Sequence, residues 1–339
     1  MQERYSRQTK IPGFGGAGQT ALAKAKVLII GCGGLGCPVA MYLSRAGLGE
    51  IGLVDADTIS LSNLHRQVLF VESDIGGLKV DAAKSALLKG NSGITVHTYP
   101  SRLNSQNYNE IIVPYDLVLD CTDNFDTRYL INDACLELGK PLVYGAANRL
   151  EGQVAVFNVN GSGHLRDLFP EVPTAGTIQN CEEAGVLGVT TGIVGDLMAL
   201  EVIKLVTAVG DPLINQLLQF DGLNTRLHVL KYTRNLAIQT EAITTSVPCV
   251  SWLDYDAKYQ TYQLVDVRTS TEREVKSRGG IHIPLDELNL NEFHIKQYEK
   301  IAFYCQTGQR AQQAVSHLSK TMANEMIAIV GNLEPKGSL

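Results

Sequence analysis

Apolar runs of the kind found in buried strands alternate with helix-like segments along the first half of the chain. The first run covers residues 27–30 and the second covers residues 51–54, with a helix-like segment at 38–45 between them. Further strand-like runs are found at 94–99, 116–119 and 142–144, separated by helix-like segments at 76–88, 107–113 and 128–138. This alternation predicts an α/β fold with a doubly wound, mostly parallel, Rossmann-like sheet covered by helices on both faces.

The pattern changes after residue 150. An alternating run at 153–159 predicts a strand, and residues 160–183 show no regular period. A segment this long inside a compact protein is usually functional or mobile. Beyond it we expect a buried amphipathic helix within 186–209 and a hairpin that pairs 217–221 with 227–232.

A Thr- and Ser-rich stretch without periodicity predicts a linker at residues 236–250. It separates a nucleotide-binding unit, residues 1–235, from a smaller α/β unit, residues 251–339. In the second unit, apolar runs near 262–268 and 301–305 predict strands, and 311–320 predicts a helix. A linker of some fifteen residues extends to about 50 Å, which allows a small domain to swing across a neighbouring site.

Composition narrows the class of protein. The 339 residues are 45% apolar and 19% charged, which is typical of a soluble globular protein of two or three domains. A net charge of −6 predicts no basic surface for nucleic acid or anionic lipid. The charged N-terminus and the lack of an apolar stretch of membrane length lead us to expect a cytoplasmic protein with no membrane contact. Seven cysteines without framework spacing indicate reduced thiols.

The first strand leads into a glycine-rich turn. It contains Gly31, Gly33, Gly34 and Gly36, and the spacing G-x-G-x-x-G lets backbone N–H groups approach a phosphate at a helix N-terminus. Asp55 follows about twenty residues later, where a carboxylate can hold ribose hydroxyls. The turn therefore predicts a nucleotide site at the carboxyl ends of the strands.

Polar residues that follow neighbouring strands extend this site. Asn63, Arg66 and Lys79 come after the strand that ends at Asp55, so two cations and an amide would lie beside the phosphates. Surface Lys and Arg are commonplace, however, and a solvated loop is the alternative. Asp120 and Asp123 follow another strand, where one of them is placed to hold Mg²⁺. For Asp123 the alternative is a helix N-cap.

Residues 4–235 resemble the E1-like adenylating enzymes that activate ubiquitin-like sulfur carriers, the molybdopterin-synthase and thiamine group of MoeB, ThiF and HesA type. The blocks that carry the resemblance are RYSRQ, GCGGLGCP, VDADTISLSNLHRQ, GGLKV, DCTDNFDTRYLINDAC, GAANRLEGQVAVF, LFPEVP and CEEAGVLGV. The resemblance implies ATP and Mg²⁺ as cofactors. It also implies a carrier protein that ends in Gly-Gly as partner, and a homodimer.

The resemblance assigns roles to individual residues. It places Asp55 on the ribose, Asn63, Arg66 and Lys79 on the phosphates, Asp123 on Mg²⁺, Arg7 on the nucleotide of the partner subunit, and Cys181 in attack on the activated carrier. For Arg7 the alternative is a solvated N-terminal arm, and for Cys181 a buried, inert thiol. The chemistry suits these residue types, because attack of a carboxylate on the α-phosphorus gathers negative charge and needs no general base.

The C-terminal part, from about residue 250, resembles a rhodanese, a sulfurtransferase domain that carries a persulfide. Its motifs are LVDVR and CQTGQR. A thiolate at Cys305 would be stabilised by the loop N–H groups, by the dipole of the following helix and by Arg310. A cysteine phosphatase would need one more residue between Cys305 and Arg310. We therefore predict adenylation of the carrier's C-terminal glycine followed by sulfur transfer to give a thiocarboxylate, with a sulfur donor such as a cysteine desulfurase.

The chain departs from both families. Most relatives of the first part bind a structural zinc with two C-x-x-C pairs, but His164 and Asp167 occupy the first position and residues 237–241 contain no cysteine. Two such ligands cannot close a tetrahedral site, so we expect no structural zinc. The rhodanese-like part is short and irregular, which favours a weak sulfurtransferase that acts on its tethered partner.

Two other functions are compatible with the glycine turn. An NAD-dependent oxidoreductase would use the same strand–turn–helix, but no hydride-handling site is identifiable and Arg66 and Lys79 stand where triphosphate charge is expected. A binding module that has lost catalysis would not need Asp55, Asp123 or Cys305. The residues do not distinguish molybdopterin, thiamine and tRNA-thiolation pathways.

Overall fold

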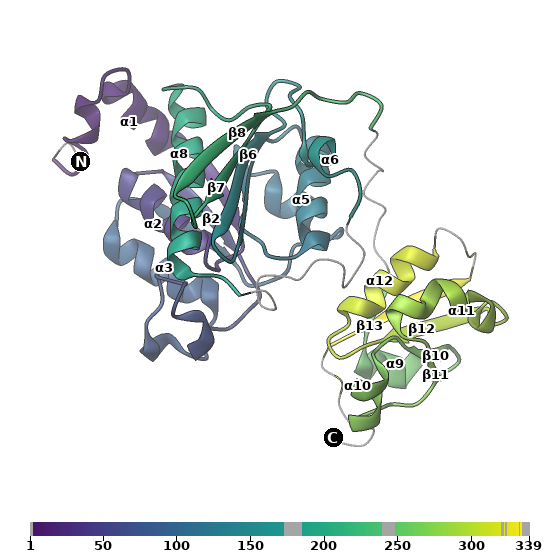
Figure 1. The fold of residues 1–339 in the computed structure, drawn as a ribbon. Coiled ribbons are helices and arrows are strands. Elements are labelled where there is room, and N and C mark those ends of the chain that lie inside the picture. The colour runs from purple at the N-terminus through teal and green to yellow at the C-terminus, as the bar shows by residue number, and fades with distance from the viewer. Residues whose placement is uncertain are drawn as a thin grey trace. The chain divides into compact units, whose positions relative to one another are not determined.

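A computed structural model of the chain describes residues 3–172, 185–238, 248–319, 322, 324–331 and 333. The chain divides into two compact units, Met1–Thr244 and Thr245–Leu339, drawn from purple to green and from green to yellow in Figure 1. Of the predicted linker, residues 239–247 lie outside the described part. Cys249 and Val250 belong to a strand of the second unit, so the last two residues of the predicted linker are part of its sheet.

The first unit is built on a sheet of eight described strands in the order β3-β2-β1-β4-β5-β6-β7-β8. Strands β3 to β5 are parallel, and β5 to β8 are antiparallel. The strands are β1 (Lys26–Ile30), β2 (Glu50–Val54), β3 (Thr95–Tyr99), β4 (Leu117–Asp120), β5 (Leu142–Asn148), β6 (Glu151–Phe157), β7 (Gln216–Asp221) and β8 (Arg226–Lys231). The predicted α/β class with a mostly parallel sheet is confirmed.

Helices cover both faces of this sheet (Figure 1). One face carries α1 (Gly15–Lys24), α2 (Gly36–Ala46), α3 (Lys79–Gly90) and α8 (Gly188–Thr207). The other carries α4 (Tyr108–Ile112), α5 (Phe125–Glu137) and α6 (Leu165–Leu168). Three single 3₁₀ turns complete the described helices, η1 (Gln8–Lys10), η2 (Leu61–Asn63) and η3 (Glu72–Asp74).

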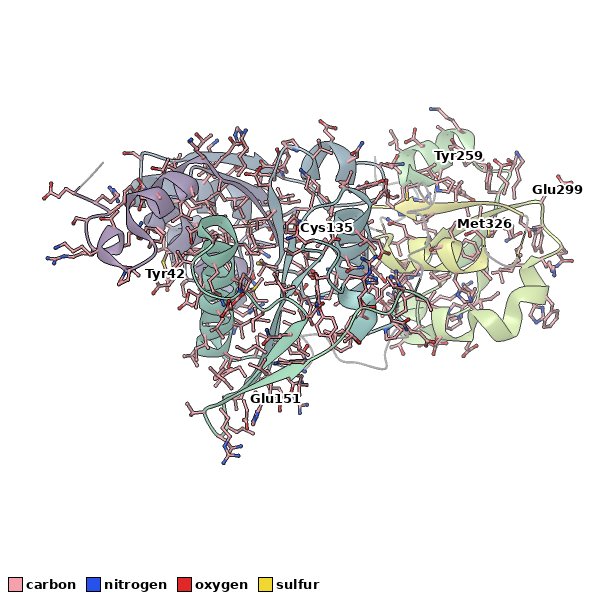
Figure 2. All side chains as sticks on the ribbon, turned by 90° about the horizontal axis from the view of Figure 1, so that it is seen from above. Tyr42, Cys135, Glu151, Tyr259, Glu299 and Met326 are labelled. Carbon is pink, nitrogen blue, oxygen red and sulfur yellow. The ribbon has the colours of Figure 1, made fainter. Side chains whose placement is uncertain are left out.

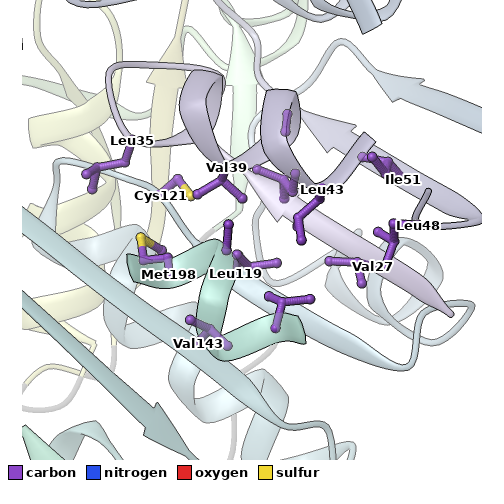
Figure 3. Packing of buried hydrophobic residues seen from close by; sticks show 14 of the residues in the cluster. Val27, Leu35, Val39, Leu43, Leu48, Ile51, Leu119, Cys121, Val143 and Met198 are labelled. Atoms are coloured by element: carbon purple, nitrogen blue, oxygen red, sulfur yellow. The ribbon is translucent and has the colours of Figure 1, made fainter. Parts of the chain in front are cut away.

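Successive side chains of β1 point to opposite faces of the sheet, and both faces are covered by helices. Val27 and Ile29 belong to the core under α2, α3 and α8, whereas Leu28 and Ile30 belong to the core under α4 and α5. Figure 3 shows the first of these cores, where side chains of α2 and α8 meet those of the strands. In the second core, Cys135 of α5 is fully buried (Figure 2).

Helix α8 has two sides of different character. Its inner side is buried, and there Glu201 pairs with Lys204 at 2.5 Å and accepts a hydrogen bond from the Leu213 N–H at 2.8 Å. Its outer side is apolar and exposed, at Val189 (65%) and Leu200 (48%). In the part of the chain that the structure describes, no helix is both long and apolar enough to span a membrane.

The second unit has a sheet of five described strands, all parallel, in the order β11-β10-β12-β13-β9. Its elements are β9 (Cys249–Ser251), α9 (Trp252–Lys258), β10 (Gln263–Asp266), α10 (Ser270–Val275), β11 (Ile281–His282), η4 (Leu285–Glu287), α11 (Leu288–Ile295), β12 (Lys300–Tyr304), α12 (Gln309–Leu318) and β13 (Glu325–Val330). Phe303 and Tyr304 of β12 face separate cores on opposite sides of the sheet. The sheet therefore positions whatever follows β12 at its carboxyl edge.

Candidate functional site

The glycine-rich turn connects the end of β1 to the start of α2. Gly31 has φ +96°, and a Cβ there would lie 2.7 Å from the Cys121 carbonyl oxygen. A Cβ on Gly36 would lie 1.9 Å from the Gly31 carbonyl oxygen, so only glycine closes the turn at these two positions. Helix α2 has no side-chain cap at its N-terminus. Of its first residues, Pro38 has no N–H and Cys37 donates to the Gly33 carbonyl oxygen at 3.0 Å, so an anion at this helix start would meet the Gly36 N–H and those of the turn.

The other two glycines face neighbouring segments. A Cβ on Gly34 would lie 3.0 Å from Thr191 of α8, which is tight, whereas at Gly33 the nearest group is the Gln67 amide at 3.9 Å. The turn is thus close-packed on its α8 side and open at Gly33. The predicted contact of these glycines with phosphate stays a prediction.

Asp55 holds the glycine turn in place. Its Oδ2 accepts a hydrogen bond from the Cys32 N–H at 2.8 Å, and its Oδ1 accepts one from the Asp57 N–H at 2.8 Å. Burial raises the pKa of Asp55, while the nearby Lys79 and the two N–H groups oppose that rise. Both carboxylate oxygens are engaged by the backbone, and the predicted contact with a ribose stays a prediction.

Asp57 presents the exposed carboxylate of this region. It lies two residues after Asp55, with its side chain 53% exposed, and its Oδ2 is 2.9 Å from the Nζ of Lys79. Its other oxygen lies 3.8 Å from Nη2 of Arg102. Asp57 is not among the residues predicted from the sequence. The signal was available in the second acid of V-D-A-D, directly past the strand end.

Lys79 is the buried cation of the site. It begins α3 and is only 7% exposed. Burial by itself would lower the pKa of Lys79, but the carboxylates of Asp55, Asp57 and Asp123 outweigh that effect and raise it. Lys79 and three acids therefore lie together at one edge of the sheet. Of these four residues, only Asp57 was not predicted from the sequence.

Asp123 and Asn124 follow β4. Asn124 is the N-cap of α5, because its Oδ1 accepts a hydrogen bond from the Thr127 N–H at 2.9 Å. Asp120 is fully buried and pairs with Nε of Arg128 at 3.1 Å. Asp123 is exposed. Of the two roles considered for Asp123, the cap belongs to its neighbour, and binding of Mg²⁺ stays a prediction.

The loop with Asn63 and Arg66 lies against the start of α8, where a Cβ on Gly188 would meet the His65 carbonyl oxygen. Asn63 accepts a hydrogen bond from the Ser60 N–H at 3.1 Å. Arg66 donates to the Ser62 carbonyl at 3.1 Å, and no carboxylate within the described ranges forms an ion pair with it.

Gln67, which the sequence analysis passed over, lies beside the glycine turn. It is 2% exposed, and its buried Oε1 has no hydrogen-bond partner among the residues the structure describes. Because its amide lies nearest to the open position at Gly33, it is a further candidate for contact with a nucleotide.

Two predicted residues lie apart from this cluster. Arg7 is the N-cap residue of η1 and is exposed. Cys181 lies outside the described residues, which include neither it nor its neighbours at 173–184.

In the second unit, Cys305 directly follows β12 and is 2% exposed. Its Sγ accepts a hydrogen bond from the Gly308 N–H at 3.1 Å. Gly308 is the N-cap of α12 with φ +99°, and a Cβ there would lie 2.6 Å from the Val330 Cα. The sulfur therefore faces the start of α12, as a thiolate stabilised by a helix dipole requires.

Arg310 lies in the first turn of α12 and is bound by Glu272 of α10. Nη1 of Arg310 lies 2.8 Å from Oε2 of Glu272, and Nη2 lies 2.5 Å from Oε1. The hydrogen bond to Glu272 raises the pKa of Arg310 most, and the nearby Cys305 raises it further. Arg310 thus lies between the sulfur and a carboxylate that the sequence analysis did not identify.

The segment at His164 is held by hydrogen bonds. Asp167 accepts hydrogen bonds from the His164 N–H at 2.7 Å and from the Asn235 N–H at 2.8 Å. Burial lowers the pKa of His164. Across the described ranges, no three His, Cys, Asp or Glu side chains gather as a metal site would need. The expectation that the chain binds no structural zinc stays a prediction.

Each of the two parts of the chain matches a known protein family. The model of the ThiF family matches residues 5–239, and that of the rhodanese-like domain matches residues 251–334. A Drosophila yakuba protein named adenylyltransferase and sulfurtransferase MOCS3 is 38% identical over 93% of this chain and 78% of its own length. The Arabidopsis thaliana protein of that name is 36% identical over 98% and 82%. The crystal structure of E. coli MccB with ATP has a TM-score of 0.62 and 25% identity over 70% of this chain and 73% of its own.

Proposed function

Because the chain belongs to the ThiF family and carries a rhodanese-like domain, we propose that it adenylates the C-terminal glycine of a ubiquitin-like carrier and then converts it to a thiocarboxylate. The family resemblance and the two activities, adenylyltransferase and sulfurtransferase, are the ones that the sequence predicted. They agree with the names of relatives that align over nearly the whole chain.

The observation that carries the adenylation step is the position of Lys79, buried beside three carboxylates at the glycine turn. The carrier's carboxylate attacks the α-phosphorus of ATP, the bond to the bridging oxygen breaks, and pyrophosphate leaves. Lys79, Arg66 and the N–H groups of the glycine turn are the groups that we assign to the phosphates, where they would oppose the charge that gathers. The nucleophile is already ionised, so no residue has to remove a proton.

Asp123 suits a magnesium ion held mainly by phosphates. Mg²⁺ in nucleotide sites takes one or two protein carboxylates and fills its other positions with phosphate oxygens and water. An exposed carboxylate that caps no helix meets that need, and Asp123 lies close enough to Lys79 to raise its pKa. Asp55 is the carboxylate that we assign to the ribose, since each of its oxygens can accept a second hydrogen bond, and the exposed Asp57 beside it is a further candidate.

The sulfur step uses Cys305. The terminal sulfur of a Cys305 persulfide attacks the acyl-adenylate, AMP leaves, and an acyl disulfide joins the carrier to Cys305. The position of Cys305 at the start of α12, with the Gly308 N–H on its sulfur, supports an anionic sulfur there. A cysteine desulfurase is the class of donor that we expect to supply the persulfide.

We assign the release step to Cys181. Its thiolate would attack the Cys305 sulfur, which frees the thiocarboxylate and leaves a Cys181–Cys305 disulfide for later reduction. Cys181→Ser should then accumulate carrier bound to Cys305. A normal thiocarboxylate yield from Cys181→Ser without added thiols would refute this assignment.

A homodimer is the assembly that we propose. The outer side of α8 exposes Val189, Ile193 and Leu200, and Tyr42 of α2 is 52% exposed (Figure 2). Apolar side chains on one helix face indicate a protein partner. A second copy of the chain fits best, because Arg7 is exposed and would reach the nucleotide of the other subunit.

The test of the adenylation step is exchange of pyrophosphate into ATP in the presence of a carrier that ends in Gly-Gly. We expect exchange with the carrier and none with a carrier that lacks its last glycine. The exchange rates measured with carriers from molybdopterin, thiamine and tRNA-thiolation pathways would show which carrier the enzyme prefers. Oxidation of NADH without any carrier-dependent exchange would instead support an oxidoreductase.

A further inference from the structure

The Glu272 side chain is held in place by hydrogen bonds from within the protein. It closes the capping box of α10, where its Oε2 accepts hydrogen bonds from Thr269 N–H at 3.0 Å and Thr269 Oγ1 at 2.9 Å. The same carboxylate binds the guanidinium of Arg310 in a two-point contact. Such a bidentate pair holds the guanidinium and the carboxylate in a fixed relative orientation.

The loop that holds Cys305 has one charged side chain. Its sequence is CQTGQR, so the positive charge that faces an incoming sulfur donor is that of Arg310. The side chains of Arg310 and Glu272 are 31% and 38% exposed, which leaves both of them at the surface of the site. A donor therefore meets a cation and an anion together, with a net charge near zero.

Basic side chains around α10 are also matched. Arg268 pairs with Asp266 at 2.7 Å and Arg278 pairs with Asp256 at 2.5 Å. Arg273 lies 3.8 Å from the same Asp266, and Lys276 donates to the neutral Leu333 carbonyl oxygen. The two close pairs take up positive charge that could otherwise attract an anion to this edge of the sheet.

Sulfur donors differ in the charge that they bring. With thiosulfate, the Cys305 thiolate attacks the outer sulfur, the S–S bond breaks, and sulfite leaves with the electron pair, so a dianion enters and a dianion departs. With a persulfide R–S–SH, the thiolate attacks the terminal sulfur and R–S⁻ leaves, so at most one negative charge enters. Binding of a dianion at Cys305 is strengthened by an unpaired positive charge far more than binding of a persulfide is.

We infer that Glu272 is a specificity-determining residue: by occupying Arg310, it makes Cys305 discriminate against dianionic donors such as thiosulfate and favour a persulfide. The inference rests on the proposed sulfurtransferase function and concerns the choice of donor at that site. It also explains why the CQTGQR loop can react slowly with thiosulfate although it contains an arginine.

The test compares Glu272→Gln with the wild type in the full chain. Glutamine can keep the capping box, so the variant removes the charge and preserves the start of α10. The rate at which Cys305 gains sulfur is measured by mass spectrometry with thiosulfate and, separately, with a persulfide-loaded cysteine desulfurase. We expect the ratio of the thiosulfate rate to the persulfide rate to rise about tenfold, as one freed charge near a dianion predicts.

Glu274→Gln is the matched control, because Glu274 lies on α10, is exposed and brings the same change in net charge. Its ratio should stay at the wild-type value. Salt gives a second readout: the thiosulfate rate of Glu272→Gln should fall more steeply with rising salt than that of the wild type. If the variant fails to fold, the wild type alone still tests the idea, because a thiosulfate rate above the persulfide rate would show that Arg310 attracts dianions in spite of Glu272.

An unchanged ratio in folded Glu272→Gln, or an equal change in Glu274→Gln, would overturn the inference. Cys305→Ser serves as the blank for both donors. If neither donor loads Cys305 in the wild type, the proposed sulfurtransferase function is wrong, and the inference about Glu272 is wrong with it.

Discussion

Two adjacent side chains, Asp123 and Asn124, have separate roles at the start of α5. Asn124 caps the helix and Asp123 does not. We predict that Asp123→Ala lowers pyrophosphate exchange by more than about tenfold, because it removes the carboxylate that we assign to Mg²⁺. Its free energy of unfolding should change by less than about 0.5 kcal/mol, as for other surface substitutions.

Asn124→Ala is the contrasting variant. Loss of the cap should lower the free energy of unfolding by about 1 kcal/mol. Urea denaturation and the exchange assay on both variants check the pair of predictions. Full exchange by folded Asp123→Ala would contradict the assignment of Mg²⁺ to this residue.

The Glu272–Arg310 pair gives a prediction in pH. The hydrogen bond from Arg310 is the main cause that lowers the pKa of Glu272 from 4.5 to about 2. A carboxylate whose pKa is lower in the folded state binds fewer protons than in the unfolded state, so its stabilisation is present above pH 4.5 and is lost as the pH falls towards 2. The stability difference between wild type and Glu272→Gln should therefore shrink over this interval.

Fluorescence offers a clean measurement, because Trp252 is the only tryptophan of the chain and lies in a core of the second unit. Urea unfolding followed by this signal at pH 6 and pH 3 would report that unit alone. Glu274→Gln should match the wild type at both values. A difference for Glu272→Gln that stays constant with pH would contradict the pairing.

Single residues show where sequence reasoning succeeds and where it stops. The sequence placed Asp123 and Cys305 at the carboxyl edge of a sheet because each follows a strand, whereas Lys79 begins α3 after a long loop and was singled out by the family resemblance. Glu272 was not foreseen, since it meets Arg310 across 38 residues of chain and only folding brings them together. Asp57 was not singled out because Asp55 was the acid of V-D-A-D assigned to the ribose, and only the folded chain shows the Asp57 carboxylate 2.9 Å from Lys79.

The turn between β1 and α2 depends on Gly36. A Cβ there would overlap the Gly31 carbonyl oxygen, so the turn must shift to accept any side chain. We predict that Gly36→Ala costs about 1–3 kcal/mol in the free energy of unfolding and lowers pyrophosphate exchange. Calorimetry and the exchange assay measure the two effects.

Gly16→Ala is the control for this element. Gly16 lies in α1 with no neighbouring atom within 4 Å of an added Cβ, so the substitution should stabilise the helix by up to about 1 kcal/mol. Equal effects of the two substitutions would argue against a packing role for Gly36.

Long apolar elements were predictable and short ones were not. The strands of the first sheet were expected within a few residues because their apolar runs are continuous. Helix α1 begins at Gly15, within a glycine-rich stretch, because burial of Phe14 and Gly18 offsets the poor helix propensity of glycine. Strand β9 has three residues, too few to show a period, and its pairing with β13 is what makes it a strand. The antiparallel direction of β6 likewise depends on pairing that no local pattern reveals.

The chain as a dimer gives a prediction about shared sites. If Arg7 reaches the nucleotide of the other subunit, Arg7→Ala and Lys79→Ala damage different halves of the same site. Mixed subunits should then form one intact site per dimer and regain up to about half of the wild-type exchange. Light scattering must first show that the mixed dimer forms. No recovery in a demonstrated mixed dimer would contradict action in trans.

The central claim is that one chain activates the carrier at Lys79 and supplies its sulfur from Cys305. Intact mass spectrometry of a Gly-Gly carrier, after incubation with ATP, Mg²⁺ and a persulfide-loaded cysteine desulfurase, tests both halves at once. We predict a carrier in which sulfur replaces one C-terminal oxygen. Cys305→Ser should yield acyl-adenylate without that product, and Lys79→Ala should yield neither. Wild-type amounts of thiocarboxylate from Cys305→Ser, or its absence from a wild type that exchanges pyrophosphate, would contradict the account.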